Sequence, residues 1–255
     1  WDDEQCWLMK YKRLASILTY GTHLCDAAVF YPVSSFDYGE NCEECKNSTF
    51  DIAEKLFNHG IDFDFIDFQS IDNSVCQDGE LNVADEKYKI LIFCNVDCIR
   101  YSNIKKVKEL LACGGKVAFV GCTPFASDLN GKNDNMLNND IAEITAHPNC
   151  IVAKDFSELF TFVNNKIQRS FIPENIACED RIFVTRRNFG NNDLFFVRYA
   201  LKGSSCRFKA TGNTYMLDSD NAKIYKLYGT QCVDGYTYIR MPNDANKDTL
   251  ILFTD

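Results

Sequence analysis

One cysteine of this chain occupies a position from which α/β proteins can present a nucleophile. Cys122 follows Gly121 at the end of the apolar run 117–120 (VAFV), which is typical of a buried strand, so a sharp turn would expose its thiol. A thiol attacks a carbonyl only as its thiolate, and it needs a base that a third group orients. The chain has three histidines, His23, His59 and His147. None stands at a spacing that pairs it with Cys122, so we favour a structural Cys122 and keep a catalytic one as the alternative.

Candidate ligand-binding residues follow the same strand and two others. An open parallel sheet binds its ligands beyond the carboxyl ends of its strands. Tyr31, Asn95 and Thr123 come at the ends of predicted strands, and they are therefore the candidates. The sequence contains no GxGxxG fingerprint, no Walker A loop and no GxSxG turn, so it indicates neither a phosphate cradle nor a serine nucleophile.

Thirteen cysteines indicate reduced thiols rather than a disulfide framework. An odd number of cysteines, scattered through strand-like and helix-like segments, does not fit a set of paired bridges. This use of cysteine favours a reducing, cytoplasmic setting for the protein. Cys42 and Cys45 form a lone CxxC within a polar loop predicted over residues 33–47. A zinc site needs two further ligands, and neither a second CxxC nor a pair of histidines follows. We expect no metal and no cofactor.

The acidic residues give no recognisable catalytic pair. Paired carboxylates, which glycoside hydrolysis requires, cannot be singled out among the 36 acidic residues. Asp62, Asp64 and Asp67 lie among apolar residues in the run 61–68 (IDFDFIDF). A period of two is typical of a half-exposed strand, and charges along such a strand discourage edge-to-edge pairing. We therefore interpret these aspartates as solvent-facing rather than metal-binding.

The elements that position these residues follow from a strand–helix–strand pattern. Residues 89–94 (KILIFC) and 117–120 are short apolar runs, and residues 104–111 between them carry apolar side chains at helical spacing, with Ser102 as the expected N-cap. A pattern of this length is a right-handed βαβ unit with parallel strands. Further strands near residues 26, 61 and 151, separated by helices, predict a five-stranded parallel sheet with helices on both faces.

From about residue 168 the pattern changes to short β-rich runs that turn signals divide. Regular spacing of such runs without helices is typical of an antiparallel sandwich or an open barrel. We therefore predict two domains, an α/β domain over 1–167 and a β-sandwich-like domain over 168–255. The first would include an amphipathic helix over residues 1–20, which packs either on a preceding domain or on its own domain.

Composition limits the partners. The net charge of −9 and the pI of about 4.9 argue against nucleic acid or an anionic membrane surface. No run approaches the roughly 18 apolar residues of a membrane-spanning helix. The chain starts at Trp1 without an initiator methionine, so we expect it to be a piece of a longer protein.

Several segments together resemble a recurrent part of large bacterial glycoside hydrolases. The most specific are 26–32 (DAAVFYP), 60–67 (GIDFDFID) and 79–93 (GELNVADEKYKILIF), within a likeness over residues 1–165. They are similar to the region after the catalytic barrel in the α-L-rhamnosidase-like family and, more distantly, to the trimerisation domain of β-galactosidases of the thermophilic type. Both resemble a class I glutamine amidotransferase fold that has lost its chemistry. The likeness therefore implies a flavodoxin-like, glutamine amidotransferase-like first domain.

The active-site pattern of the amidotransferases is incomplete in this chain. Pro124 stands where that family has a glycine two residues after its cysteine, and the stretch 147–149 (HPN) lacks the acidic partner of the histidine. The resemblance thus implies a carbohydrate-active parent protein whose catalytic residues lie in a barrel outside this chain.

Three functions follow as expectations. The first is a non-catalytic accessory part that packs against a preceding catalytic domain of the same polypeptide or mediates homo-oligomerisation. The second is a carbohydrate-binding module in which aromatic side chains of the β-rich part contact sugars. The candidate tyrosines are Tyr225, Tyr228, Tyr236 and Tyr238. The third is an amidotransferase-like enzyme that uses Cys122.

Overall fold

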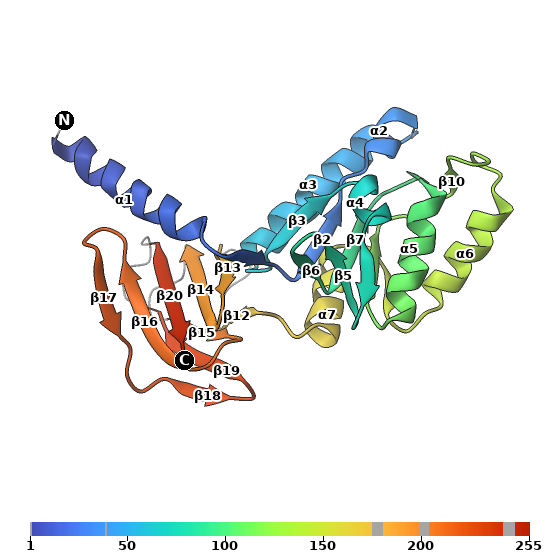
Figure 1. Cartoon of the computed structure of the whole chain (residues 1–255). Coiled ribbons are helices and arrows are strands. Elements are labelled where there is room, and N and C mark those ends of the chain that lie inside the picture. The colour runs from blue at the N-terminus through green and yellow to red at the C-terminus, as the bar shows by residue number, and fades with distance from the viewer. Residues whose placement is uncertain (1, 39, 175–180, 199–203, 242–247) are drawn as a thin grey trace. The chain divides into compact units, whose positions relative to one another are not determined.

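The computed structural model describes residues 2–38, 40–174, 181–198, 204–241 and 248–255. They fall into two compact units (Figure 1). We call residues 26–56 and 63–168 the α/β unit. We call the described residues within 1–25, 57–62 and 169–255 the β-rich unit, to which the chain therefore contributes three separate segments.

A parallel sheet forms the centre of the α/β unit. Its strands run in the order β11-β9-β7-β2-β3, and each neighbouring pair is parallel. The bounds are β2 (Ala27–Phe30), β3 (Phe63–Ile66), β7 (Ile90–Cys94), β9 (Lys116–Val120) and β11 (Cys150–Ala153). The parallel pairing of β7 with β9 confirms the predicted βαβ unit, and the five predicted strands are all present.

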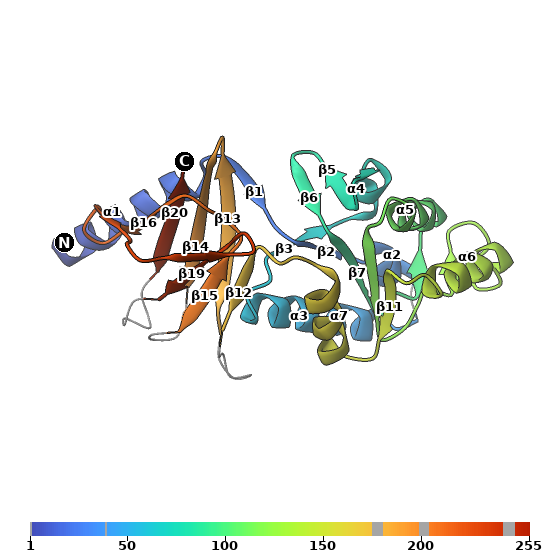
Figure 2. The same cartoon turned by 90° about the horizontal axis from the view of Figure 1, so that it is seen from below.

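Helices cover both faces of this sheet (Figure 2). Helices α3 (Cys42–Asn58) and α7 (Phe156–Lys166) lie on one face, and α5 (Tyr101–Ala112) and α6 (Asn135–Thr145) lie on the other. Every residue of β7 is buried as a result, which is why its sequence (ILIFC) is apolar without alternation. No described helix is long and apolar enough to cross a membrane.

Two helix starts differ from the sequence-based expectation. Helix α5 begins after Arg100 rather than at a Ser102 cap, and the side chain of Asp128 accepts the Tyr101 N–H at 2.8 Å in place of a local cap. Helix α3 begins at Cys42, so the CxxC lies in its first turn and not in a loop. Both differences arise because contacts distant in sequence set the helix start, and local patterns do not contain them.

Short elements at the edges of the sheet were not predicted from the sequence. They are α2 (Val33–Tyr38), α4 (Phe68–Asp72), the parallel pair β8 (Cys98–Ile99) and β10 (Ala126–Ser127), and the antiparallel meander of β4 (Val75–Gln77), β5 (Glu80–Val83) and β6 (Glu86–Tyr88). Elements of two to six residues are too short for their periodicity to be recognised.

The aspartates of the run 61–68 are not simply solvent-facing. Asp67 accepts the Ser70 N–H at 2.7 Å at the start of α4. Asp64 accepts the hydroxyl of Tyr88 at 3.0 Å. In the β-rich unit, Asp62 lies 2.7 Å from Nε2 of His23. The expected half-exposed edge strand is present as β3, but the carboxylates of Asp64 within it and of Asp62 and Asp67 beside it have specific partners.

The β-rich unit contains two antiparallel sheets, as predicted. The larger has the order β1-β13-β14-β20-β16-β17, and the smaller has the order β12-β15-β19-β18. The larger sheet comprises β1 (Thr22–Leu24), β13 (Phe183–Phe189), β14 (Asn192–Arg198), β20 (Thr249–Thr254), β16 (Asn213–Asp218) and β17 (Lys223–Lys226). The smaller comprises β12 (Phe171–Pro173), β15 (Ser205–Phe208), β19 (Tyr236–Arg240) and β18 (Gln231–Val233).

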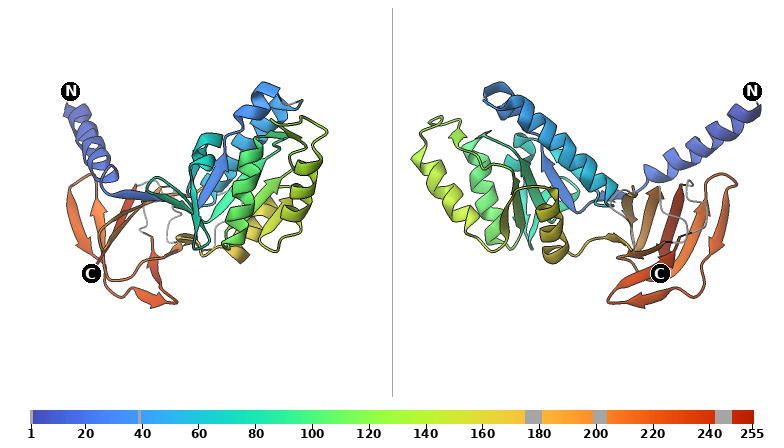
Figure 3. Two further views of the ribbon diagram at one scale, coloured as in Figure 1. Left: turned by 45° about the vertical axis from the view of Figure 1, so that its right-hand side comes forward. Right: turned by 180° about the vertical axis from the view of Figure 1, so that it is seen from behind.

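Strand β14 shows how both faces of the larger sheet are buried. Phe195 belongs to a core cluster that includes Phe208 of the smaller sheet. The two sheets therefore pack face to face as a sandwich. The neighbours of Phe195 along the strand, Leu194 and Phe196, point the other way, into a cluster with Leu14 of helix α1 (Asp2–Leu18). Figure 3 shows this blue helix beside the orange and red strands. The helix therefore packs in the β-rich unit, whereas the sequence pattern had placed it in the first domain.

Candidate functional site

The carboxyl edge of the parallel sheet carries a cavity of about 690 Å³. Binding sites for small molecules have volumes of about 300–1,000 Å³ and mostly apolar walls with a few polar groups. The apolar wall includes Val33, Phe68 and Ile99, and the charged groups are Asp37, Arg100, Asp128 and Lys132. The cavity thus lies at the edge where open parallel sheets bind ligands.

Short elements after the strands build the walls of this cavity. The chain leaves β7 through β8 and leaves β9 through β10, and these two strands pair in parallel beyond the sheet. The hydroxyl of Ser35 in α2 donates to the Cys98 carbonyl at 3.2 Å and accepts the Cys98 N–H at 3.3 Å, which fixes α2 against β8. Ser127 of β10 donates its hydroxyl to Asp134, the N-cap of α6. Several helices and strands therefore hold the cavity in shape.

The charged groups of the cavity differ in their surroundings. Lys132 forms an ion pair with Glu40. Asp128 is engaged by the Tyr101 N–H at the start of α5, where the helix dipole favours a negative charge. The guanidinium of Arg100 stacks on the Phe68 ring, 3.5 Å from its centroid. The cavity therefore contains charges of both signs, only some of which are compensated locally.

The predicted ligand-binding residues lie at the carboxyl edge, but the described lining of the cavity does not include them. Tyr31 is partly exposed and packs in a cluster of rings with Phe36, Phe50 and Phe65. Thr123 is half-buried in the loop after β9. Residues two to twelve positions beyond the strand ends line the cavity instead, and β8 and β10 are the elements that carry several of them there.

Asn95 has a structural role that its sequence position did not suggest. Its backbone has a φ of 47°, and its N–H donates to the Val120 carbonyl at 2.8 Å. The side-chain Oδ1 accepts the Cys122 N–H at 3.1 Å. A Cβ at Gly121, where φ is 84°, would collide with that oxygen. Asn95 thus links the ends of β7 and β9.

Cys122 lies at the predicted turn, yet its surroundings disfavour a thiolate. The side chain is half-buried, and Sγ lies 3.8 Å from the Val96 carbonyl oxygen. Burial raises the pKa of the Cys122 thiol, and the negative charges of Asp97 and Glu44 raise it further. An activated cysteine has the opposite environment, with a positive charge or a helix N-terminus that lowers its pKa. The thiol is therefore a poor nucleophile at neutral pH.

The only histidine in the sequence of the α/β unit cannot assist Cys122. His147 follows α6, and its Nδ1 lies 3.2 Å from the Asn149 nitrogen just before β11 begins at Cys150. It therefore lies at the amino edge of the sheet, whereas Cys122 follows the carboxyl end of β9. A strand of this length separates the two edges by about 13 Å. A pairing of Cys122 with a histidine base is therefore absent within this unit.

The CxxC also lacks the features of a reactive or metal-binding pair. Cys45 is buried, and burial raises the pKa of its thiol to about 12. In the described part of the chain, no group of potential ligands large enough to hold a metal includes Cys42 or Cys45. A helix N-terminus lowers the pKa of a nearby thiol, but for Cys45 the opposite effect of burial is larger.

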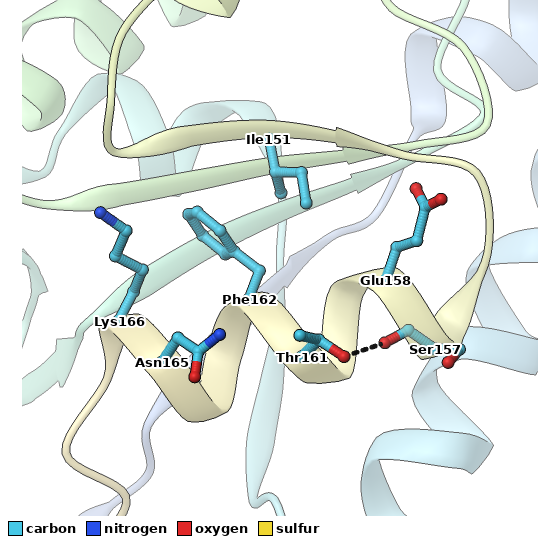
Figure 4. A pocket seen from close by; sticks show the side chains of 7 residues that line it. All are labelled: Ile151, Ser157, Glu158, Thr161, Phe162, Asn165 and Lys166. Atoms are coloured by element: carbon cyan, nitrogen blue, oxygen red, sulfur yellow. Dashed lines mark hydrogen bonds between the residues drawn. The ribbon is translucent and has the colours of Figure 1, made fainter.

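A second, smaller hollow of about 350 Å³ lies beside α7 and β11 (Figure 4). Ile151 and Phe162 form its apolar part, Glu158 extends from the first turn of the helix, and Asn165 and Lys166 extend from its last turn. Thr161 donates its hydroxyl to the Ser157 carbonyl at 2.9 Å. One helix and one strand make a shallow groove here, so we regard the cavity at the carboxyl edge as the candidate site.

No protein-family profile matches the chain, and comparison with curated proteins finds no significant relative. Solved structures do match. A rhamnosidase from Novosphingobium sp. PP1Y is 15% identical with a TM-score of 0.71, over 98% of this chain and 24% of that chain. A β-galactosidase from Bacillus circulans sp. alkalophilus is 10% identical with a TM-score of 0.57, over 96% and 44%. An α-L-fucosidase from Paenibacillus thiaminolyticus is 10% identical with a TM-score of 0.55, over 92% and 49%.

These similarities concern the fold, because all three identities are at or below 15%. The chain spans between about a quarter and a half of the length of these three proteins. Both units take part in the likeness, since more than nine-tenths of the chain is covered each time. The mixed fold of a parallel sheet with antiparallel sheets is therefore one that occurs as a part of larger glycoside hydrolase chains.

Proposed function

We propose that this chain is a non-catalytic accessory part of a multidomain glycoside hydrolase. One observation carries the proposal. Nearly the whole of this chain resembles a part, less than half in length, of three glycoside hydrolase chains, and these three are named for different sugars. A part that recurs beside different specificities is expected to serve the architecture of the enzyme rather than its chemistry. The partner would be the catalytic domain of the same polypeptide, and homo-oligomerisation is the second architectural role.

The surroundings of Cys122 support a non-catalytic role. Hydrolysis of an amide by a cysteine needs a thiolate and a base within hydrogen-bond reach. The raised pKa of Cys122 and the position of His147 at the opposite edge of the sheet remove both requirements within the α/β unit. We therefore rank an amidotransferase-like enzyme last among the three functions.

The finer description of the fold is part of the same proposal. We assign the α/β unit to the flavodoxin-like, glutamine amidotransferase-like class, because its strand order corresponds to 2-1-3-4-5 when the five strands are numbered along the chain. We also propose that each unit is a domain, with a boundary near residue 168. Helix α1 would belong to the β-sandwich-like domain, since Leu14 packs with Leu194 and Leu250.

A carbohydrate-binding module is the alternative that a specific observation favours. Tyr225 and Tyr228 are 42% and 84% exposed on and beside the edge strand β17, where a sugar ring could stack on them. The other two candidates are engaged within the unit. Tyr236 is buried and donates its hydroxyl to the Arg169 carbonyl at 2.7 Å, and Tyr238 packs near the Arg207 guanidinium.

The gene tests the proposal most simply. We expect the reading frame that encodes this chain to encode a catalytic barrel as well. A reading frame that encodes this chain with no glycoside hydrolase catalytic domain would contradict the accessory role. Loss of sugar binding in the double variant Tyr225→Ala/Tyr228→Ala, with unchanged binding in Tyr238→Ala, would favour the carbohydrate-binding alternative instead.

A further inference from the structure

The cavity at the carboxyl edge contains a preorganised cation without a counter-ion. Arg100 precedes α5 at the N-cap position, and its guanidinium lies flat on the Phe68 ring at 3.5 Å from the centroid. Within the described residues, no carboxylate forms an ion pair or hydrogen bond with it. Stacking fixes the plane of the guanidinium and leaves its N–H groups at the edge of that plane available. A planar fork of donors is suited to a carboxylate or phosphate group.

Hydrogen-bond acceptors lie in the same cavity. Asp37 of α2 is exposed and lines it, and no described residue bonds to its carboxylate. Asp128 contributes a second carboxylate, of which Oδ1 accepts the Tyr101 N–H. These acceptors disfavour an occupant that carries only negative charge, and they favour one that also offers several hydroxyl donors. Arg100 and Asp37 together therefore select a ligand with an anionic group and hydroxyl groups.

The walls and the volume of the cavity further limit the class of ligand that fits it. Val33, Phe68 and Ile99 supply apolar surface, on which the C–H faces of a sugar ring can pack. A volume of about 690 Å³ holds more than one sugar ring, whereas an amino acid would occupy a small part of it. Lys132 also lines the cavity, and its ion pair with Glu40 compensates its charge.

We propose that this cavity binds an acidic saccharide of about disaccharide size, with its carboxylate on Arg100 and its hydroxyl groups on Asp37. This inference rests on the proposed function for the choice of a saccharide, and it goes beyond that function by assigning a binding site and a ligand class. The proposal assigns binding of the ligand to this site, in keeping with the non-catalytic role proposed for the chain.

Calorimetric titration of the whole chain with defined probes tests the site. The probes are digalacturonate and a glucuronate-containing disaccharide, with lactose as the neutral disaccharide and glutamate as an amino acid that also carries carboxylates. We expect one of the acidic disaccharides to bind and lactose and glutamate not to bind. Arg100→Gln should weaken the binding at least about tenfold, since it removes a charged hydrogen bond. Arg100→Lys should weaken it less, and Asp37→Asn severalfold.

Lys166→Gln is the matched control, because it removes a cation that lines the separate groove beside α7. It should leave the affinity unchanged. The Arg100 variants should fold normally, since the Arg100 side chain makes no capping hydrogen bond to α5, and thermal unfolding checks this. Absence of binding by both acidic probes, equal binding of lactose, binding of glutamate, or an affinity unaffected by Arg100→Gln would each overturn the proposal. Catalytic turnover by the chain would instead contradict the proposed function, so the two failures are distinguishable.

Discussion

At the scale of single residues, the turn after β9 is defined by a contact between two strand ends. Asn95 adopts a positive φ so that its side chain can bond the Cys122 N–H, and Gly121 leaves the space that this side chain occupies. The sequence placed Asn95 and Cys122 at the correct edge of the sheet. It could not reveal that they bond to each other, because 27 residues separate them along the chain.

This contact predicts a difference between two glycine variants. Gly131→Ala places a side chain at a φ of 63° in open space, so it should cost about 1 kcal/mol in the free energy of unfolding. Gly121→Ala has the same conformational cost at a φ of 84° and also a collision with the Asn95 side chain, so it should cost about 1–3 kcal/mol more. Urea unfolding of both variants measures this. Equal costs would show that Asn95 does not fill the space beside Gly121.

At the scale of elements, the long periodic segments were predictable and the short ones were not. The five parallel strands and helices α5, α6 and α7 have patterns that local sequence defines. Helix α3 starts earlier than predicted because Asp97, from the loop after β7, accepts the backbone N–H groups of Glu40 and Asn41. The strands β8 and β10 consist of two residues each, and they exist only because they pair with each other.

Helix α1 provides a prediction with a matched control. Leu14 is 7% exposed and packs with Leu194 and Leu250, whereas Leu8 in the same helix is 63% exposed. Leu14→Ala should therefore lower the free energy of unfolding by about 2–4 kcal/mol, and Leu8→Ala should change it by less than about 0.5 kcal/mol. Thermal or urea unfolding gives both values. A similar effect of the two substitutions would mean that α1 does not pack on the larger sheet of the β-rich unit.

The cap of α6 predicts a pH dependence. Hydrogen bonds from Ser127 and from the Leu137 and Met136 N–H groups lower the pKa of Asp134 below the ordinary value of 3.8. A lowered pKa in the folded state means that the ionised carboxylate stabilises the fold above pH 3.8 and that this contribution is lost as the pH falls through the folded-state pKa. Asp134→Asn keeps a capping oxygen but cannot be protonated in this range.

The variant should therefore lose less stability than the wild type when the pH is lowered from about 5 to 2. Urea unfolding at several pH values in this window measures the difference between the two proteins. The variant Asp155→Asn, which changes the capping carboxylate of α7, is measured beside them for comparison. Parallel pH profiles of wild type and Asp134→Asn would contradict the account of this cap.

At the scale of the whole chain, the sequence predicted the two kinds of architecture but not the path of the chain between them. The change from helix-separated to turn-separated strands near residue 168 is visible in the sequence, and the chain passes from one unit to the other at that point. Residues 1–25 and 57–62 also belong to the β-rich unit, because β1 pairs with β13 and Leu14 packs on the larger sheet. Contacts of this sequence separation leave no local pattern.

For the candidate site, too, the sequence indicated the location but not the residues that form it. The rule that ligands bind beyond the carboxyl ends of parallel strands indicated the edge at which the cavity lies. Tyr31, Asn95 and Thr123 remain predictions as ligand-binding residues, and the cavity lies among residues farther along the loops. Arg100 and Phe68 are 32 positions apart, so their stacking could not be anticipated from the sequence.

The most direct test of the central claim is an assay of catalytic turnover by the purified chain. The substrates are aryl rhamnosides, aryl galactosides and glutamine, and the Cys122→Ala variant is assayed beside the wild type. We predict no turnover of glutamine, because Cys122 has no histidine base within its unit and the pKa of its thiol is raised. We predict no turnover of the glycosides, because the proposed function places the catalytic carboxylates outside this chain. Glutaminase activity that disappears in Cys122→Ala, or glycosidase activity in either protein, would contradict the account.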